Sequence, residues 1–185
     1  MIPYYELTIS FEEAVIEIQH VFEKYYSNAL TDVYFNSQET LGNLPILREL
    51  LNKIKIYNPY FMVVIIDSGK RFPPHVHQMP YSPWNLLIPV KNTKNSFTQF
   101  FKRIYLPNKS IEYNDVGEEV VCETYDIELC EVTHEIEVIR PVLINVGVLH
   151  GVLNPLENNG VRHILSIVIT NPNYNPLEDA NDYII

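Results

Sequence analysis

Glycine and cysteine are scarce in this chain, and the scarcity of each has a consequence. Six glycines occur among 185 residues, whereas Tyr, Phe, Ile and Val are frequent, and this balance favours β structure. Two cysteines, Cys122 and Cys130, are too few for a disulfide framework. Free buried thiols are therefore expected, and a reducing compartment, the cytoplasm, is the predicted location.

Long apolar runs are also missing. No run approaches the roughly 20 residues that a membrane-spanning helix needs, and the start of the chain has no basic stretch before an apolar one, so no secretory signal is predicted. Hydrophobic residues make up 46% of the chain, which excludes an intrinsically disordered protein. We expect one globular domain over residues 1–185, with no membrane partner.

Acidic residues are absent between Lys70 and Lys109, although the whole chain has a net charge of −10. The stretch contains seven basic residues: Lys70, Arg71, Lys91, Lys94, Lys102, Arg103 and Lys109. A positive field there would favour an anionic substrate. Alternatively, these side chains lie on solvated strand edges and pair partly with the acidic segment 112–137. The acidic balance of the whole chain argues against nucleic acid as a partner.

Two amphipathic helices are predicted ahead of a β region. Ser10 and Glu13 form a capping box at the start of a helix over residues 10–26, which carries an apolar stripe at helical spacing. Pro45 begins a second helix over residues 45–56, at a position that favours proline. Residues 1–59 are therefore expected to form a helical support that covers one sheet.

Short strands separated by turn signals follow as far as Thr170. The predicted strands cover residues 60–66, the stretch around His75, and residues 84–90, 97–105, 119–129, 132–138, 141–149 and 161–170. Strands of this length and spacing predict two facing antiparallel sheets in a sandwich or barrel of jelly-roll type. Residues 60–170 are expected to form this core, and residues 171–185 an irregular tail.

His75 and His77 are the centre of the candidate site. Side chains two residues apart on a strand point to the same face, so both imidazoles can reach one divalent metal. His150 is the best candidate for a third ligand, because a β-barrel brings strands that are remote in sequence together. One histidine alone is more often a surface or hydrogen-bonded structural residue, but the three together predict a metal site.

Arg162 and Ser166 share a face of the last long strand, because an even spacing separates them. A buried arginine is costly unless it is paired, and a carboxylate fits its planar guanidinium best. The strand therefore predicts an anchor for a small dicarboxylate whose other end reaches the metal. Alternatively, Arg162 is exposed at the start of the strand and pairs with a nearby glutamate.

Taken in order, these motifs resemble the iron(II)/2-oxoglutarate-dependent dioxygenase superfamily, and in particular its small, mostly uncharacterised bacterial and phage members. The family's H-x-D pair corresponds to His75-Val-His77 here. The motifs that follow in the family's order are Asn85-Leu-Leu-Ile-Pro-Val90, Phe97-Thr-Gln-Phe-Phe101, Leu149-His-Gly-Val-Leu-Asn-Pro155 and Arg162-His-Ile-Leu-Ser166. The resemblance covers residues 60–170.

The resemblance implies a double-stranded β-helix, a cupin-like jelly roll, and an enzyme that hydroxylates an unactivated C–H bond of a small molecule or side chain. It implies Fe(II) bound by His75, His77 and His150. It implies 2-oxoglutarate bound through Arg162 and Ser166, with Asn85 beside it. The candidate walls of the substrate pocket are Trp84, Phe97, Gln99 and Phe101.

One departure from the family pattern is His77, which stands where the family carries a carboxylate. In another register His77 is the first ligand and Met79 takes the carboxylate position, but the spacing from His77 to Asn85 favours the first register. The nearest alternative is a cupin with a three-histidine metal site that does not use 2-oxoglutarate. A jelly-roll binding protein without activity is the third reading, and the substrate, the metal and the oligomeric state stay open.

Overall fold

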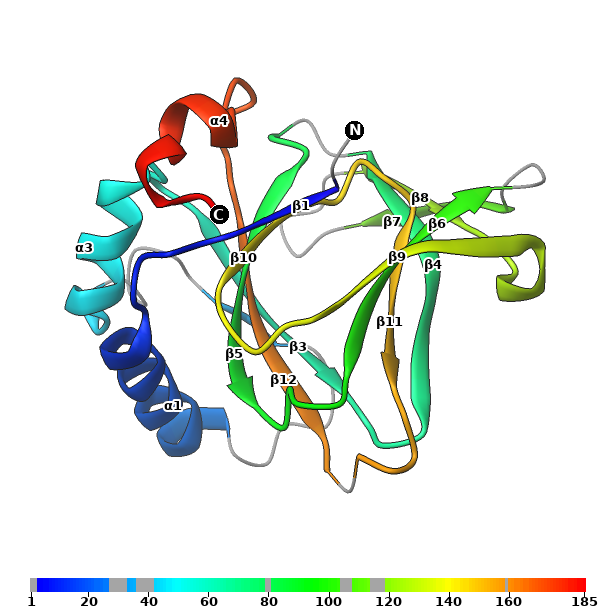
Figure 1. Cartoon of the computed structure of the whole chain (residues 1–185), viewed down its shortest axis with the longest axis horizontal. Helices are drawn as coiled ribbons and strands as arrows, with labels where there is room; N and C mark the ends of the chain where they lie inside the picture. Colours follow the sequence, from blue (N-terminus) through cyan, green and yellow to red (C-terminus); the bar gives the residue numbers. More distant parts are fainter. Residues whose placement is uncertain are drawn as a thin grey trace.

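The computed structural model describes residues 3–26, 33–35, 42–78, 81–103, 108–113, 119–158 and 160–185. In this part of the chain two antiparallel sheets face each other, and helices lie outside one of them (Figure 1). The predicted class, mainly β with helices on the N-terminal side, is confirmed. The helices are α1 (Glu12–Tyr26), α3 (Pro45–Lys53) and α4 (Pro176–Asp179), and the 3-10 turns are η1 (Ile127–Leu129) and η2 (Asn181–Tyr183).

Each sheet has six strands within the described residues. The one that we call the major sheet has the order β1 (Tyr4–Glu6), β10 (Val142–Asn145), β5 (Trp84–Lys91), β12 (Arg162–Val168), β3 (Tyr60–Ile66) and β2 (Val33–Phe35). The other, the minor sheet, has the order β7 (Asn108–Tyr113), β8 (Glu119–Thr124), β4 (Lys70–Gln78), β11 (His150–Asn154), β6 (Phe97–Arg103) and β9 (Cys130–Glu137).

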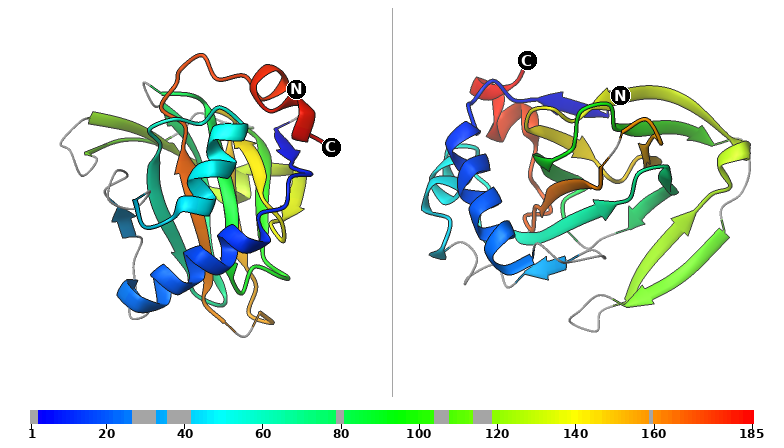
Figure 2. Two further views of the ribbon diagram at one scale, coloured as in Figure 1. Left: turned by 90° about the vertical axis from the view of Figure 1, so that its left-hand side faces the viewer. Right: turned by 90° about the horizontal axis from the view of Figure 1, so that it is seen from below.

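The strand pairing is that of a jelly roll. β3 pairs with β12, β4 with β11, β5 with β10 and β6 with β9, so the chain forms one long nested hairpin wound across both sheets. The β7–β8 hairpin is inserted between β6 and β9 and continues the minor sheet beside β4. It projects from the rest of the molecule in the right-hand view of Figure 2. The nesting makes neighbours of β4 and β11, which carry the three histidines.

The helices α1 and α3 cover the outer face of the major sheet (Figure 2, left). The buried apolar stripe of α1 packs with α3 and with alternate residues of β3, β5 and β12. Glu17 of α1 accepts hydrogen bonds from the backbone N–H groups of Ile46 (3.3 Å) and Leu47 (3.1 Å), which lie at the start of α3. The carboxylate thus caps α3 and ties the two helices together.

Both predicted helices are found, with shorter bounds. The first begins at Glu12, whose N–H donates a hydrogen bond to the Ser10 hydroxyl (3.4 Å). The second ends at Lys53, and Lys55 follows with a φ of 55°, a left-handed conformation that stops a helix. No helix in the described part of the chain has the length and apolarity needed to cross a membrane.

The predicted strand over residues 141–149 is wrong in its second half. It ends at Asn145, whose side chain accepts a hydrogen bond from the Gly147 N–H (3.0 Å) and turns the chain into the other sheet. β11 then begins at His150, where the sequence predicts a strand end. In the same way, the predicted strand over residues 119–129 ends at Thr124 and continues as η1.

The tail also differs from the irregular segment that the sequence predicts. It contains α4 and η2, and Tyr174 is buried and donates a hydrogen bond to the carbonyl of Ile54 (3.1 Å). Ile184 forms a bridge with Leu7. Cys130 is a half-buried free thiol, and the side chain of Cys122 lies outside the described part of the structure.

Candidate metal centre

Three histidines converge between the two sheets. His150 is the register partner of His75 on the paired strands β11 and β4, and His77 follows two residues later on the same face. One ring nitrogen of each histidine lies within 4.8 Å of the others. The Nε2 atoms of His75 and His77 are 2.8 Å apart. The structure therefore brings the three predicted ligands together.

A β-bulge beside the cluster sets this arrangement. The pairing of β4 with β11 shifts between His150 and Val152, opposite Pro73 and Pro74, which have no N–H to donate. Gly151 faces the bulge, and a Cβ there would lie 2.8 Å from the carbonyl oxygen of Phe72. Only glycine lets β11 approach β4 this closely next to His150.

Backbone carbonyls orient two of the three rings. The Nδ1–H of His75 donates to the carbonyl of Pro73 (2.9 Å), and the Nδ1–H of His150 donates to the carbonyl of Val148 (2.9 Å). With Nδ1 protonated, the lone pair of each ring is on Nε2, the nitrogen that faces the cluster. Metal-binding histidines are commonly held by such a hydrogen bond from the other ring nitrogen.

The spacing of the Nε2 atoms fits a shared metal ion. Two nitrogens bound at about 2.1 Å and at right angles lie about 3 Å apart, close to the 2.8 Å between His75 and His77. His75, His77 and His150 would hold the ion, and no other described histidine, cysteine or carboxylate joins them. An exogenous ligand would then complete the coordination of the ion.

Burial keeps the three imidazoles neutral. His75 and His150 are each 5% exposed and His77 is partly exposed. Desolvation lowers the pKa of all three histidines, and that of His77 falls to about 3. For His77 and His150 the neighbouring histidines lower the pKa further. Neutral imidazole is the metal-binding form. No carboxylate joins the cluster in the described part of the chain, so the protein offers the ion neutral ligands.

Arg162 lies on the inner face of the major sheet and is 1% exposed. Its Nη2 donates to the Thr98 hydroxyl of β6 (3.3 Å), and its Nε has no hydrogen-bond partner among the described residues. Burial lowers the pKa of Arg162 to about 9. The alternative that Arg162 is exposed and paired with a glutamate is wrong, and the unpartnered nitrogen marks a place where a buried anion would be stabilised.

Ser166 and Asn85 share this inner face with Arg162. The amide of Asn85 donates to the Ser166 hydroxyl (3.3 Å), and both side chains are buried. The next residue after Arg162, His163, faces the opposite side and contacts the ring of Phe22 in α1 (4.9 Å between ring centroids). The three residues predicted to hold a dicarboxylate are thus placed on the side of the sheet that faces the histidines.

The predicted walls of the pocket lie elsewhere and need correction. In β6 the register partner of His150 is Phe100, and Thr98 shares its face. Alternation therefore puts the predicted wall residues Phe97, Gln99 and Phe101 on the opposite face. The fourth, Trp84, packs in the core beneath the helices, 5.3 Å from the ring of Tyr5.

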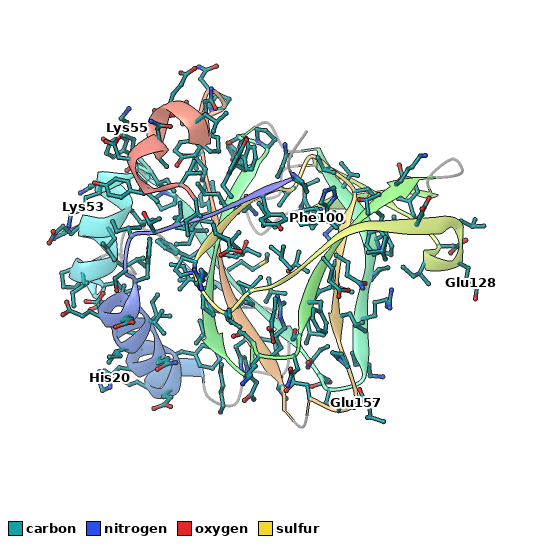
Figure 3. All side chains as sticks on the ribbon, in the orientation of Figure 1. His20, Lys53, Lys55, Phe100, Glu128 and Glu157 are labelled. Atoms are coloured by element: carbon teal, nitrogen blue, oxygen red, sulfur yellow. The ribbon has the colours of Figure 1, made fainter. Side chains whose placement is uncertain are left out.

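The error in β6 is a shift of one residue in a strand that has apolar side chains on both faces. Phe100, labelled in Figure 3, and Thr98 take the predicted places beside the histidines. Neither was singled out by the sequence pattern. The double proline before His75 was the one visible signal of the bulge at Gly151.

The basic stretch does not gather at the histidines. The side chains of Lys70, Arg71, Lys91, Lys94 and Lys102 are exposed, which fits the alternative of solvated edges and loops. The side chains of two others, Arg103 and Lys109, lie outside the described part of the structure. Met79, the carboxylate position of the second register, also lies outside it, whereas His75 and His77 both lie in the cluster.

The fold and the site together define a jelly-roll protein with a candidate three-histidine metal centre. No model of a known protein family matches the sequence, and no curated protein matches it. The crystal structure of AviO1 from Streptomyces viridochromogenes Tue57 superposes on this chain with a TM-score of 0.53 and 14% identity. The superposition covers 94% of this chain and 92% of AviO1. A Pseudomonas putida prolyl-4-hydroxylase has a TM-score of 0.48, with 10% identity, and covers 91% of each chain. The similarity to AviO1 shows a shared fold.

Proposed function

We propose that this protein is an oxygenase that uses Fe(II) and 2-oxoglutarate to hydroxylate a C–H bond of a small-molecule or side-chain substrate. One observation carries the proposal. The same interior holds three imidazoles that turn Nε2 inward and a buried Arg162 whose Nε has no hydrogen-bond partner in the described part of the chain. Bound Fe(II) would supply the oxidation, in which one atom of O2 enters the substrate and the other enters succinate as 2-oxoglutarate loses CO2.

His75, His77 and His150 would hold the ion, and Arg162 would bind the far carboxylate of 2-oxoglutarate. Thr98, which accepts a hydrogen bond from Arg162, lies two residues from Phe100, the register partner of His150. Two residues of strand span about 7 Å. That separation suits a five-carbon dicarboxylate with one end at the metal and the other on the guanidinium.

Charge balance supports a dianionic co-substrate. The histidines leave both positive charges of the metal ion uncompensated, and Arg162 adds a third positive charge to the same interior. The two carboxylates of 2-oxoglutarate offset most of this charge. A neutral co-substrate would leave the buried cations unpaired.

Metal analysis and 2-oxoglutarate binding test the proposal. We expect the full chain, purified without chelator and loaded with Fe(II) in the absence of O2, to bind 2-oxoglutarate only when metal is present and to release succinate when O2 is admitted. Arg162→Met should weaken 2-oxoglutarate binding by roughly tenfold to a hundredfold. It should still bind metal, which checks that it is folded.

The matched control is Arg140→Met. Arg140 is an exposed arginine that pairs with Glu6 at 3.4 Å, so its loss should leave 2-oxoglutarate binding unchanged. If the two variants behave alike, Arg162 has no role in binding the co-substrate and the proposal fails.

A cupin-type metalloenzyme that does not use 2-oxoglutarate is the second candidate. It is favoured by the three-histidine set, which has no carboxylate among the described residues. Metal binding by a chain that does not bind 2-oxoglutarate would support it. If no metal binds, a jelly-roll binding protein without activity replaces both enzymes.

A further inference from the structure

The space between the two sheets has a closed half and an open half. The closed half lies between β10, β5 and β12 on one side and β6 and β9 on the other. Its core side chains are at most 8% exposed, and the partly buried Tyr4 and Val148 pack against them. The open half lies between β3 and β12 on one side and β4 and β11 on the other. Four of its inward side chains are buried: Ile66, Asn154, Arg162 and Ser166. Seven others are half-buried or exposed: Tyr60, Met62, Val64, Lys70, Phe72, Val152 and Val168.

The open half adjoins the histidine cluster. The ring of Phe72 packs edge-on against His75, with 4.7 Å between ring centroids and 70° between ring planes. Phe72 is nevertheless 41% exposed, and Tyr60 on the facing strand β3 is 42% exposed. The large apolar side chain of Phe72 is thus left accessible beside a buried ligand, where a protein with no further group to bind would close its core.

The bulge puts Phe72 in this position. Three residues separate Phe72 from His75, an odd spacing that would place them on opposite faces of a regular strand. The irregularity at Pro73 and Pro74 lets Phe72 pair with Val152 on the same face as the pair of His75 and His150. The same feature that positions a candidate ligand therefore also brings an aromatic ring against it.

We propose that Phe72 and the open half form the substrate subsite, and that this subsite takes an uncharged apolar group and presents it to the metal. The inference rests on the proposed function and specifies its substrate class. Beside Phe72 the half-buried or exposed side chains of Val64 and Val152 are apolar. Two charged side chains face the open half: Arg162, which 2-oxoglutarate would occupy, and Lys70, which is exposed and separated from His75 by Phe72 along β4. A charged group next to Phe72 would therefore lose its hydration without gaining a partner.

The test uses two probes of similar shape, toluene and benzoate, with the full chain saturated with 2-oxoglutarate so that Arg162 is occupied. The chain is loaded with paramagnetic Mn(II) or diamagnetic Zn(II), and the relaxation of the probe's ring protons is measured by NMR. We expect Mn(II) to enhance the relaxation of toluene several-fold over Zn(II) and to leave benzoate unaffected. Equal enhancement of both probes, or of neither, would overturn the inference.

Variants locate the subsite. Phe72→Ala should weaken toluene binding roughly tenfold, and Phe72→Leu, which keeps an apolar side chain, should restore most of it. Tyr57→Ala removes another exposed aromatic side chain, 56% exposed, and should have no effect. An equal loss in Phe72→Ala and Tyr57→Ala would mean that toluene binds apolar surface without selection.

A metal-free readout separates this inference from the proposed function. Toluene should shift the ring resonances of Phe72 and His75 in the chain without metal. If the chain binds no metal, the oxygenase proposal fails, but these shifts still decide whether the apolar subsite exists. If metal and 2-oxoglutarate bind and toluene moves neither ring, the subsite is wrong and the oxygenase proposal stands.

Discussion

Gly151→Ala is predicted to disturb the candidate metal centre without touching a ligand. The added Cβ would lie 2.8 Å from the carbonyl oxygen of Phe72 and 3.3 Å from the carbonyl carbon of Pro73. Both are backbone atoms of the bulge, so neither can rotate away as a side chain can. β11 must therefore move away from β4, and His150 moves with it, since it is the residue before Gly151.

Two magnitudes follow from this displacement. Inserting a methyl group into a packed site costs about 1–3 kcal/mol of the free energy of unfolding. Misplacing a ligand through the groups that support it lowers metal affinity by roughly 10–100-fold. Urea unfolding of the metal-free chain measures the first, and calorimetric titration with Zn(II) or Fe(II) measures the second.

Gly42→Ala is the control, because a Cβ at Gly42 meets no atom within 4 Å. It should change neither the free energy of unfolding nor the free energy of metal binding by more than a few tenths of a kcal/mol. If Gly151→Ala unfolds and binds metal as Gly42→Ala does, the close approach of β11 to the bulge does not set the position of His150.

Three further predictions concern single side chains. Glu17→Gln should lower the free energy of unfolding by about 0.5–2 kcal/mol, because it weakens the cap of α3, whereas Glu157→Gln in an exposed turn should not; equal urea midpoints would contradict this. Acidification of the metal-free chain from pH 7 to pH 5 should destabilise it, because His77, with a pKa of about 3 in the folded protein against about 6.5 when unfolded, takes up its proton only on unfolding. At pH 5 His77 alone then lowers the free energy of unfolding by about 2 kcal/mol. His77→Asn should reduce this pH dependence of stability, and His20→Asn, at an exposed position, should leave it unchanged. His77→Asp should bind Fe(II) at least as tightly as the natural chain in anaerobic titration, because the carboxylate adds a negative ligand; loss of binding would contradict a carboxylate position at residue 77.

The sequence predicted the fold best where one periodicity dominates. The stripe of α1 and the continuous apolar run of β3 have one reading each, and both elements are found. β11 was missed because its five residues contain Gly151 and follow a turn that depends on a side-chain contact within the chain, from Asn145 to Gly147. No local pattern of apolar residues records such a contact.

In the candidate site the sequence predicted the metal ligands but not the walls of the pocket. The convergence of His75, His77 and His150 follows from spacing and from the way that a jelly roll pairs distant strands. The walls do not follow, because β6 is buried on both faces and its alternation leaves two registers open. Thr98 and Phe100 are found beside the histidines only once β6 is paired with β11.

The nested hairpin has a consequence for how the chain folds. His75 and His150 are 75 residues apart in sequence, and they become neighbours only when most strands of the jelly roll have paired. Closing so long a loop has a large entropic cost, so their contact forms slowly. During synthesis the third histidine emerges only after β10, and a shorter nascent chain lacks the complete set. An ion bound by all three would then cross-link β4 and β11, two strands that are far apart in sequence. Because these strands must separate when the jelly roll unfolds, the bound ion would slow unfolding.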